Sequence, residues 1–166
     1  MKYLDKTPKV DASSKVFPGA LVIGDVTIGK SVGIWYNAVL RGDMAKITIG
    51  DNTNIQDGVI VHTNTDLPTY IGRNVTVGHN AIIHASTIQD GALIGMGSIV
   101  LDGAIVESEA LVGAGCLVPP NKVVKSRTLV VGNPMKEVKT LSEKELEAIK
   151  HNKDVYVSLL NDYTIK

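Results

Sequence analysis

Residues 88–130 read IQDGALIGMGSIVLDGAIVESEALVGAGCLVPPNKVVKSRTLV, with an isoleucine or valine at every sixth position. The same spacing extends through most of the chain. The aliphatic series runs 10, 16, 22, 28, 34, 40, then 49, 55, 61, then 71, 77, 83, and then from 88 to 130, and 16 of its 19 intervals are six residues long. A period of six fits neither a helix nor an array of hairpins, but it is typical of short strands joined by tight turns. The sequence therefore predicts an all-β parallel β-helix built from six-residue repeats.

Glycines and interruptions mark the corners of this predicted solenoid. A glycine directly follows the aliphatic residue at several repeats, and we expect these glycines to supply the positive φ that tight corners require. Three intervals break the period: 40–49 and 61–71 are too long, and 83–88 is one residue short. Insertions in a solenoid are expected to form loops, and both insertions flank the histidines.

The composition limits the classes of function. Apolar residues make up 44% of the 166 positions and charged residues 20%, as in ordinary globular proteins. The 17 basic and 17 acidic residues balance, so the sequence predicts neither a nucleic-acid nor a membrane partner. Met1–Lys6 lacks the apolar core of a secretory signal, and Cys116 is the only cysteine. These features favour a cytoplasmic protein.

The pattern changes after residue 130. Pro134, in the sequence Gly132-Asn133-Pro134, stops the repeats, and Ser142 with Glu145 forms a predicted capping box at the start of a helix. We therefore expect a β-helix domain over residues 1–134. A C-terminal α-helical tail over residues 135–166 is expected to pack on the solenoid.

Three of the four histidines fall between residues 62 and 84, and the repeat register places two of them together. The six-residue repeats resemble the hexapeptide-repeat family, in which three strands complete one triangular coil. His62 follows Val61 and His84 follows Ile83, and the resemblance implies that one full coil separates Val61 from Ile83. The two histidines therefore occupy equivalent positions on adjacent coils, about 4.8 Å apart, which is the spacing of neighbouring strands. Alternation along the strand turns both imidazoles outward. Two imidazoles at this separation can share one divalent metal ion.

His79 follows Val77 by two residues and lies on another side of the triangular coil, where it does not easily reach the same ion. Packing three chains side by side would bring His79 of one chain to His62 and His84 of the next. Such a site has three nitrogen ligands and an open position for water. The sequence therefore predicts a homotrimer with metal sites between its subunits.

The same register makes a second prediction about this interface. Arg41 stacks one coil below His62, and Asp57 stacks one coil below His79. If the histidines meet across an interface, Arg41 and Asp57 of adjacent chains should meet as well. His151, in the tail, has no such neighbours and is expected to be an ordinary surface residue. Cys116 falls at a small inward position and is expected to pack in the core.

The segments Arg41-Gly42-Asp43 and Asn54-Ile55-Gln56-Asp57-Gly58, together with His62, Gly78-His79 and His84, resemble the γ-class carbonic anhydrase family and its close bacterial relatives. The resemblance runs over nearly the whole chain. It implies the left-handed form of the β-helix, although crossovers between parallel strands are otherwise almost always right-handed. It also implies that His62, His79 and His84 bind zinc, with iron or cobalt as alternative metals.

The resemblance assigns further roles around this metal. Gln56 and Asn54 would orient the bound water and the substrate, and Tyr156 on the tail helix would approach the site. The remaining three residues, Arg41, Asp43 and Asp57, would be interface residues or would support the ligands.

The activity that the resemblance implies is reversible CO2 hydration, a lyase reaction. The metal lowers the pKa of bound water to about 7, and the resulting hydroxide attacks CO2 to give bicarbonate. Two other classes stay open because one scaffold hosts several chemistries. An acetyl-CoA-dependent acyltransferase is the first, since Gly132-Asn133-Pro134 resembles the closing segment of those enzymes, and thioester hydrolysis by the metal-bound hydroxide is a variant. A non-catalytic metal-binding or assembly protein is the second.

Overall fold

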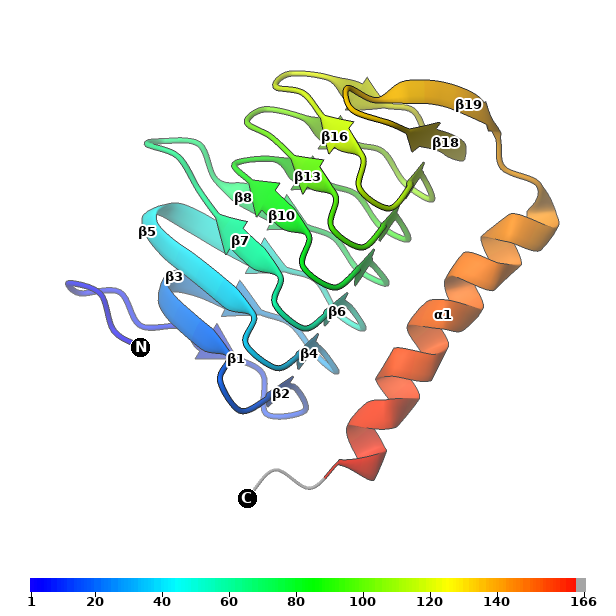
Figure 1. The fold of residues 1–166 in the computed structure, drawn as a ribbon. Coiled ribbons are helices and arrows are strands. Elements are labelled where there is room, and N and C mark those ends of the chain that lie inside the picture. Colours follow the sequence, from blue (N-terminus) through cyan, green and yellow to red (C-terminus); the bar gives the residue numbers. More distant parts are fainter. Residues whose placement is uncertain (164–166) are drawn as a thin grey trace.

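A three-sided solenoid with a long helix beside it forms the described part of the chain, residues 1–163, in the computed structural model (Figure 1). The first face contains β3 (Leu21–Ile28), β5 (Val39–Ile49), β7 (Ile60–His62), β10 (Ile82–His84), β13 (Ile99–Val100) and β16 (Leu117–Val118). The second face contains β1 (Lys9–Val10), the later parts of β3 and β5, β8 (Thr69–Ile71), β11 (Thr87–Ile88), β14 (Ile105–Val106) and β17 (Val123–Val124). The third face contains β2 (Lys15–Val16), β4 (Gly33–Ile34), β6 (Asn54–Ile55), β9 (Thr76–Val77), β12 (Leu93–Ile94), β15 (Leu111–Val112), β18 (Thr128–Val131) and β19 (Lys136–Thr140).

Strands of successive coils pair in parallel, as the six-residue period predicts. Residues of the aliphatic series lie opposite one another in register, for example Ile83 between Val61 and Val100. From Val22 to Val130 every member of the series is at most 8% exposed. Cys116 is buried among them, which confirms its expected place in the core. The fold is the left-handed parallel β-helix with a C-terminal helix that the sequence predicted.

The corners correct one expectation about glycine. Positive φ occurs three residues after the inward aliphatic residue, at positions such as Asn52, Asn74 and Asn80, and the glycines directly after the aliphatic residue do not adopt it. Those glycines are needed for another reason. A Cβ on Gly50 would lie 2.6 Å from the backbone nitrogen of Arg73, because the next coil stacks directly above it.

The two insertions behave differently. Residues 40–49 were expected to form a loop, and this expectation is wrong, because β5 continues as one strand around the corner from the first face to the second. Residues 43–46 have no pairing partner on the adjacent coils, because the register with β3 shifts there, and the backbone N–H of Ala45 donates instead to Oγ1 of Thr63 at 3.1 Å. Residues 63–68 do leave the solenoid as a loop, which an antiparallel bridge between Asn64 and Leu67 closes.

The tail is only partly helical. Residues 136–140 were expected to belong to a helical tail, but they form β19, which pairs antiparallel with β18 and extends the third face. The helix α1 (Glu143–Asp162) follows, and Ser142 and Glu145 form the predicted capping box at its start. Figure 1 shows α1 running beside the solenoid from the last coils toward the first ones. No helix within residues 1–163 is both long and apolar enough to cross a membrane.

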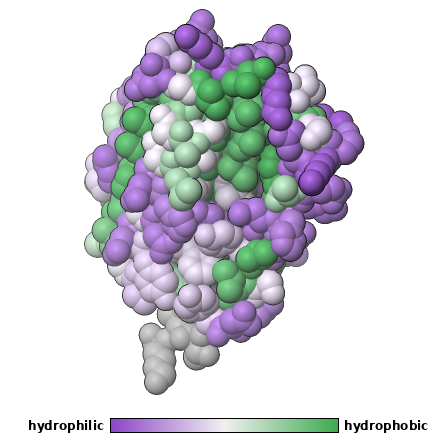
Figure 2. Space-filling view, turned by 45° about the vertical axis from the view of Figure 1, so that its right-hand side comes forward, coloured by the Kyte–Doolittle hydropathy of each residue, from purple (hydrophilic) through white to green (hydrophobic). Residues whose placement is uncertain are grey.

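Aromatic side chains fix the far end of α1 to the third face. The rings of Phe17 and Trp35 stack with their centroids 4.3 Å apart, and Tyr156 of α1 meets Trp35 edge-on at 5.5 Å. Leu160 is buried in the same cluster. On the side of the molecule that Figure 2 brings forward, apolar side chains gather over the upper coils, whereas the lower part is mostly polar with one smaller apolar patch. The aromatic contacts therefore hold the helix near one corner of the solenoid.

The capping box generates a pH prediction. The hydrogen bond from Lys139, followed by those from the backbone and hydroxyl of Ser142, lowers the pKa of Glu145 to about 2 from its ordinary 4.5. Because this pKa is depressed in the folded state, the stabilisation is complete above pH 4.5 and is lost as the pH falls toward 2. We expect Glu145→Gln to weaken the pH dependence of the helical circular dichroism signal over this range.

Glu147→Gln is the matched control, since Glu147 is exposed on the same helix and takes no part in the capping box. This variant should keep the pH dependence of the natural chain. Identical acid profiles for the two variants would contradict the assignment.

Candidate metal centre

His62 and His84 meet at the corner between the first and second faces, as the register predicted. They are direct partners in the pairing of β7 with β10. The ring centroids lie 5.1 Å apart, and Nδ1 of His62 is 3.1 Å from Nε2 of His84. The two half-buried rings therefore present one nitrogen each to the same small volume.

A carboxylate binds the other nitrogen of each ring. Nε2 of His62 lies 3.0 Å from Oδ1 of Asp43, and Nδ1 of His84 lies 2.5 Å from Oδ1 of Asp102. Burial alone would raise the pKa of Asp43, but hydrogen bonds from His62 and Arg41 outweigh it and lower this pKa. For Asp102, hydrogen bonds from Asn64 and then His84 lower the pKa. Both carboxylates are therefore anionic acceptors that fix the orientation of the rings.

These contacts decide which nitrogens carry hydrogen. An ionised carboxylate only accepts hydrogen bonds, so Nε2 of His62 and Nδ1 of His84 are the donors. In the neutral rings, the two facing nitrogens then both carry lone pairs, at a separation of 3.1 Å. A cation between them satisfies both lone pairs. Two nitrogens on one tetrahedral zinc ion lie about 3.3 Å apart, so this pair fits a divalent metal ion closely.

His79 lies at the corner between the third and first faces. Its Nδ1 is 2.8 Å from Oδ2 of Asp57, the residue one coil below it, as the register predicted. Its backbone N–H donates to Oε1 of Gln56 at 3.1 Å, and Nε2 of Gln56 donates to Oδ1 of Asn54 at 3.1 Å. Gln56 and Asn54 are both buried, so in this chain they order the backbone under His79.

Helix α1 brings Tyr156 to the same corner. Its hydroxyl oxygen lies 3.3 Å from Nε2 of His79. Burial, and then the negative charge of Asp57, raises the pKa of Tyr156, so its hydroxyl keeps the proton that it can donate. The helix therefore completes the surroundings of His79.

The three histidines do not come together within one chain. No three His, Cys, Asp or Glu side chains among residues 1–163 are arranged to hold a metal ion. The reason is topological, because His79 occupies a different corner from His62 and His84. Arg41 pairs with Asp43 of its own chain. His151 is exposed on α1, away from these residues, as expected.

Sequence reasoning missed Asp102. Val100 pairs with Ile83, which places position 101 directly above His84. Asp102 is the residue after that position. The short interval 83–88 is the reason for this register. The signal was present, since a search for carboxylates within one position of the paired residue on the adjacent coil would have found it.

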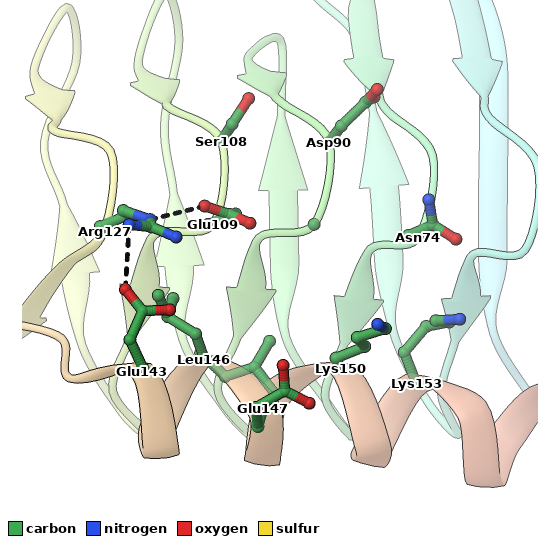
Figure 3. Close-up of a pocket in the computed structure, with 12 residues that line it drawn as sticks. Asn74, Asp90, Ser108, Glu109, Arg127, Glu143, Leu146, Glu147, Lys150 and Lys153 are labelled. Atoms are coloured by element: carbon green, nitrogen blue, oxygen red, sulfur yellow. Dashed lines mark hydrogen bonds and ion pairs between the residues drawn. The ribbon is translucent and has the colours of Figure 1, made fainter.

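A separate cavity of about 460 Å³ lies between α1 and the corner that joins the second and third faces. Figure 3 shows Arg127 contacting both Glu109 and Glu143 at one end, with Lys150 and Lys153 at the other. None of the residues proposed above lines this cavity. Because Arg127 is already paired with two carboxylates, the cavity offers no unmet charge there that would select a ligand.

The geometry defines a hexapeptide-repeat protein with a divided histidine–carboxylate site. No family model matches the chain. It is 47% identical over 155 residues to a carbonic anhydrase of Geobacillus kaustophilus, covering 93% of this chain and 85% of that protein. It is also 47% identical over 165 residues to the mitochondrial γ carbonic anhydrase 2 of Arabidopsis thaliana, covering 96% of this chain but 59% of that protein. A solved hexapeptide transferase family protein from Anaplasma phagocytophilum superposes with a TM-score of 0.92 at 41% identity, over 98% of this chain and 96% of that one.

The chain belongs to the γ carbonic anhydrase family. It spans about 60% of the length of the mitochondrial γ carbonic anhydrases 1 and 2 of Arabidopsis thaliana.

Proposed function

We propose that this protein is a metal-dependent hydratase that interconverts CO2 and bicarbonate. His62 and His84 of one subunit and His79 of a neighbour would bind the metal. One observation carries the proposal: each histidine has one ring nitrogen on a carboxylate, and the free nitrogens of His62 and His84 face each other at 3.1 Å. Metal-binding histidines almost always hold a carboxylate or carbonyl in this way. The carbonic anhydrase relatives support the same reaction.

Three neutral imidazoles leave the metal its full charge and one open position, which is typical of catalytic sites. A divalent ion there supplies Lewis-acid chemistry, which makes water a nucleophile near neutral pH. The three carboxylates hold the ligands in the required tautomer and orientation. Imidazole ligands suit zinc, iron and cobalt alike, and we propose zinc with iron or cobalt as alternatives.

The first face supports a homotrimer. Its outward positions form a continuous aliphatic ladder in register: Leu21, Val39, Ile60, Ile82, Ile99 and Leu117. Leu21 and Ile60 are 43% and 37% exposed in the single chain. The ladder runs between the two corners that carry the histidines. Burying this face against neighbouring copies joins each His79 corner to a His62–His84 corner, and a head-to-tail contact of this kind closes into a ring.

Two charged residues fit the same arrangement. Arg41 lies directly below His62 in the pairing of β5 with β7, and Asp57 lies below His79. Arg41 remains partly exposed beside Asp43, so its guanidinium group has donors left for the Asp57 carboxylate of a neighbour. The pair would set the register between subunits.

The transferase named among the solved relatives keeps acyl transfer as the second candidate. In that reaction one histidine would act as a general base, and acetyl-CoA or another acyl thioester would be the substrate. Thioester hydrolysis is a variant of the metal reaction. The metal content of the protein separates these classes, because acyl transfer by a general base does not require the metal.

The proposed function generates three predictions, and the first of these concerns metal content. Protein purified without chelators should contain about one metal ion per chain by elemental analysis, and it should hydrate CO2. His84→Ala removes one of two facing nitrogens and should lose both the metal and the activity. His151→Ala is the matched control and should keep both, because His151 is exposed on α1.

A chain that binds no metal, even after reloading, and that transfers acetyl groups from acetyl-CoA would establish the transferase alternative instead. A fully metallated protein without CO2 hydration would identify a metal-binding or assembly protein.

The second prediction concerns Asp102. Asp102→Asn keeps the size of the side chain but replaces the anionic partner of His84, so metal affinity should fall about 10- to 100-fold in a chelator competition. Asp90→Asn is the control, since Asp90 pairs with Arg73 and contacts none of the histidines. Equal affinity of the two variants would show that Asp102 does not support the ligand.

The third prediction concerns assembly. Ile60→Lys places a charge in the middle of the aliphatic ladder and should convert the trimer to monomers in light scattering coupled to gel filtration. Val123→Lys changes an outward residue of the second face that is 47% exposed, and it should leave the trimer intact. If the Ile60→Lys variant is still a trimer, the interface between subunits does not lie on the first face.

A further inference from the structure

The contact between Tyr156 and His79 has a consequence for metal binding. Nδ1 of His79 lies 2.8 Å from Oδ2 of Asp57. A carboxylate oxygen has no proton to offer, so the proton of the neutral ring belongs on this nitrogen and the lone pair on Nε2. The hydroxyl of Tyr156 lies 3.3 Å from that same Nε2 and donates to it. Tyr156 therefore occupies the one nitrogen with which His79 can bind a metal ion.

A single lone pair cannot serve a hydroxyl proton and a metal ion at once. We propose that, in the metal-free protein, the hydroxyl of Tyr156 hydrogen-bonds to Nε2 of His79 and blocks metal binding there, and that metal binding breaks this bond. We call this contact the Tyr156 latch. The inference rests on the proposed function, since it assumes that His79 is a ligand. The contact with Asp57 persists in both states, so only the bond from Tyr156 has to break.

The position of Tyr156 links this latch to the helix. Its ring meets Trp35 edge-on at 5.5 Å, and Trp35 is 4% exposed beneath the end of α1. Release of the hydroxyl therefore changes the packing of Tyr156 against Trp35. Trp35 is the only tryptophan in the chain, so its fluorescence reports this movement without interference from another indole. Because Trp35 is buried, subunit contacts at the surface affect it little.

The apparent metal affinity equals the intrinsic affinity multiplied by the fraction of chains in which Nε2 of His79 is not bonded to Tyr156, so the latch lowers it. A hydrogen bond of ordinary net strength corresponds to a reduction of about 2- to 10-fold. Tyr156→Phe removes the hydroxyl and keeps the ring against Trp35. This variant should therefore bind the metal more tightly than the natural chain, by the same factor.

The test titrates Zn²⁺ into the full chain after metal removal by a chelator. Three proteins are compared: the natural chain, Tyr156→Phe and Tyr36→Phe. The last is a matched control, because Tyr36 lies one coil below Asp57 and packs on Phe17, but its hydroxyl has no hydrogen-bond partner among residues 1–163. The two readouts are the dissociation constant, from competition with a zinc indicator, and the emission of Trp35.

In the natural chain and in Tyr36→Phe, zinc should shift the emission of Trp35. In Tyr156→Phe, zinc should bind about 2- to 10-fold more tightly, and the emission shift should be reduced. Equal or weaker binding by Tyr156→Phe would overturn the latch while leaving the metal site in place. Absence of zinc binding in all three proteins would overturn the proposed function and the latch together.

Discussion

Parallel pairing of each coil with the next is the interaction on which the whole structure depends. One inward aliphatic side chain every six residues fills a narrow core, and the strand spacing holds equivalent residues of adjacent coils in contact. This stacking makes the residues at each corner a column, so that side chains 17 to 22 residues apart in sequence become neighbours. These stacked corner residues can therefore form a defined site, although the core beneath them is thin and repetitive.

Two of these columns carry the chemistry. One corner combines His62 and His84 with Asp43 and Asp102, and the other combines His79 with Asp57. In each case the carboxylate fixes the ring tautomer and leaves one nitrogen for a ligand. The aliphatic ladder of the first face lies between the columns, so the surface that buries well against another copy is also the surface that would join the two halves of the site.

The C-terminal segment adds what repetition cannot supply. A solenoid presents similar surroundings on every coil, whereas β19 and α1 bring residues from the end of the chain to particular places on it. Tyr156 reaches His79 because Trp35 and Phe17 anchor the end of α1 at that corner. The helix therefore makes one coil chemically different from its neighbours.

The sequence by itself determined the fold, the inward and outward residues, and the stacking of His62 with His84 and of Asp57 with His79, because a fixed period converts position in the chain directly into position on the solenoid. It predicted the capping box as well, since that motif is local. The continuous strand β5, the place of Asp102 and the approach of α1 to within 3.3 Å of His79 were decided only by the tertiary structure. Each depends on how the chain behaves where the period breaks or ends, and there the contacts between coils, not the spacing of residues, set the geometry.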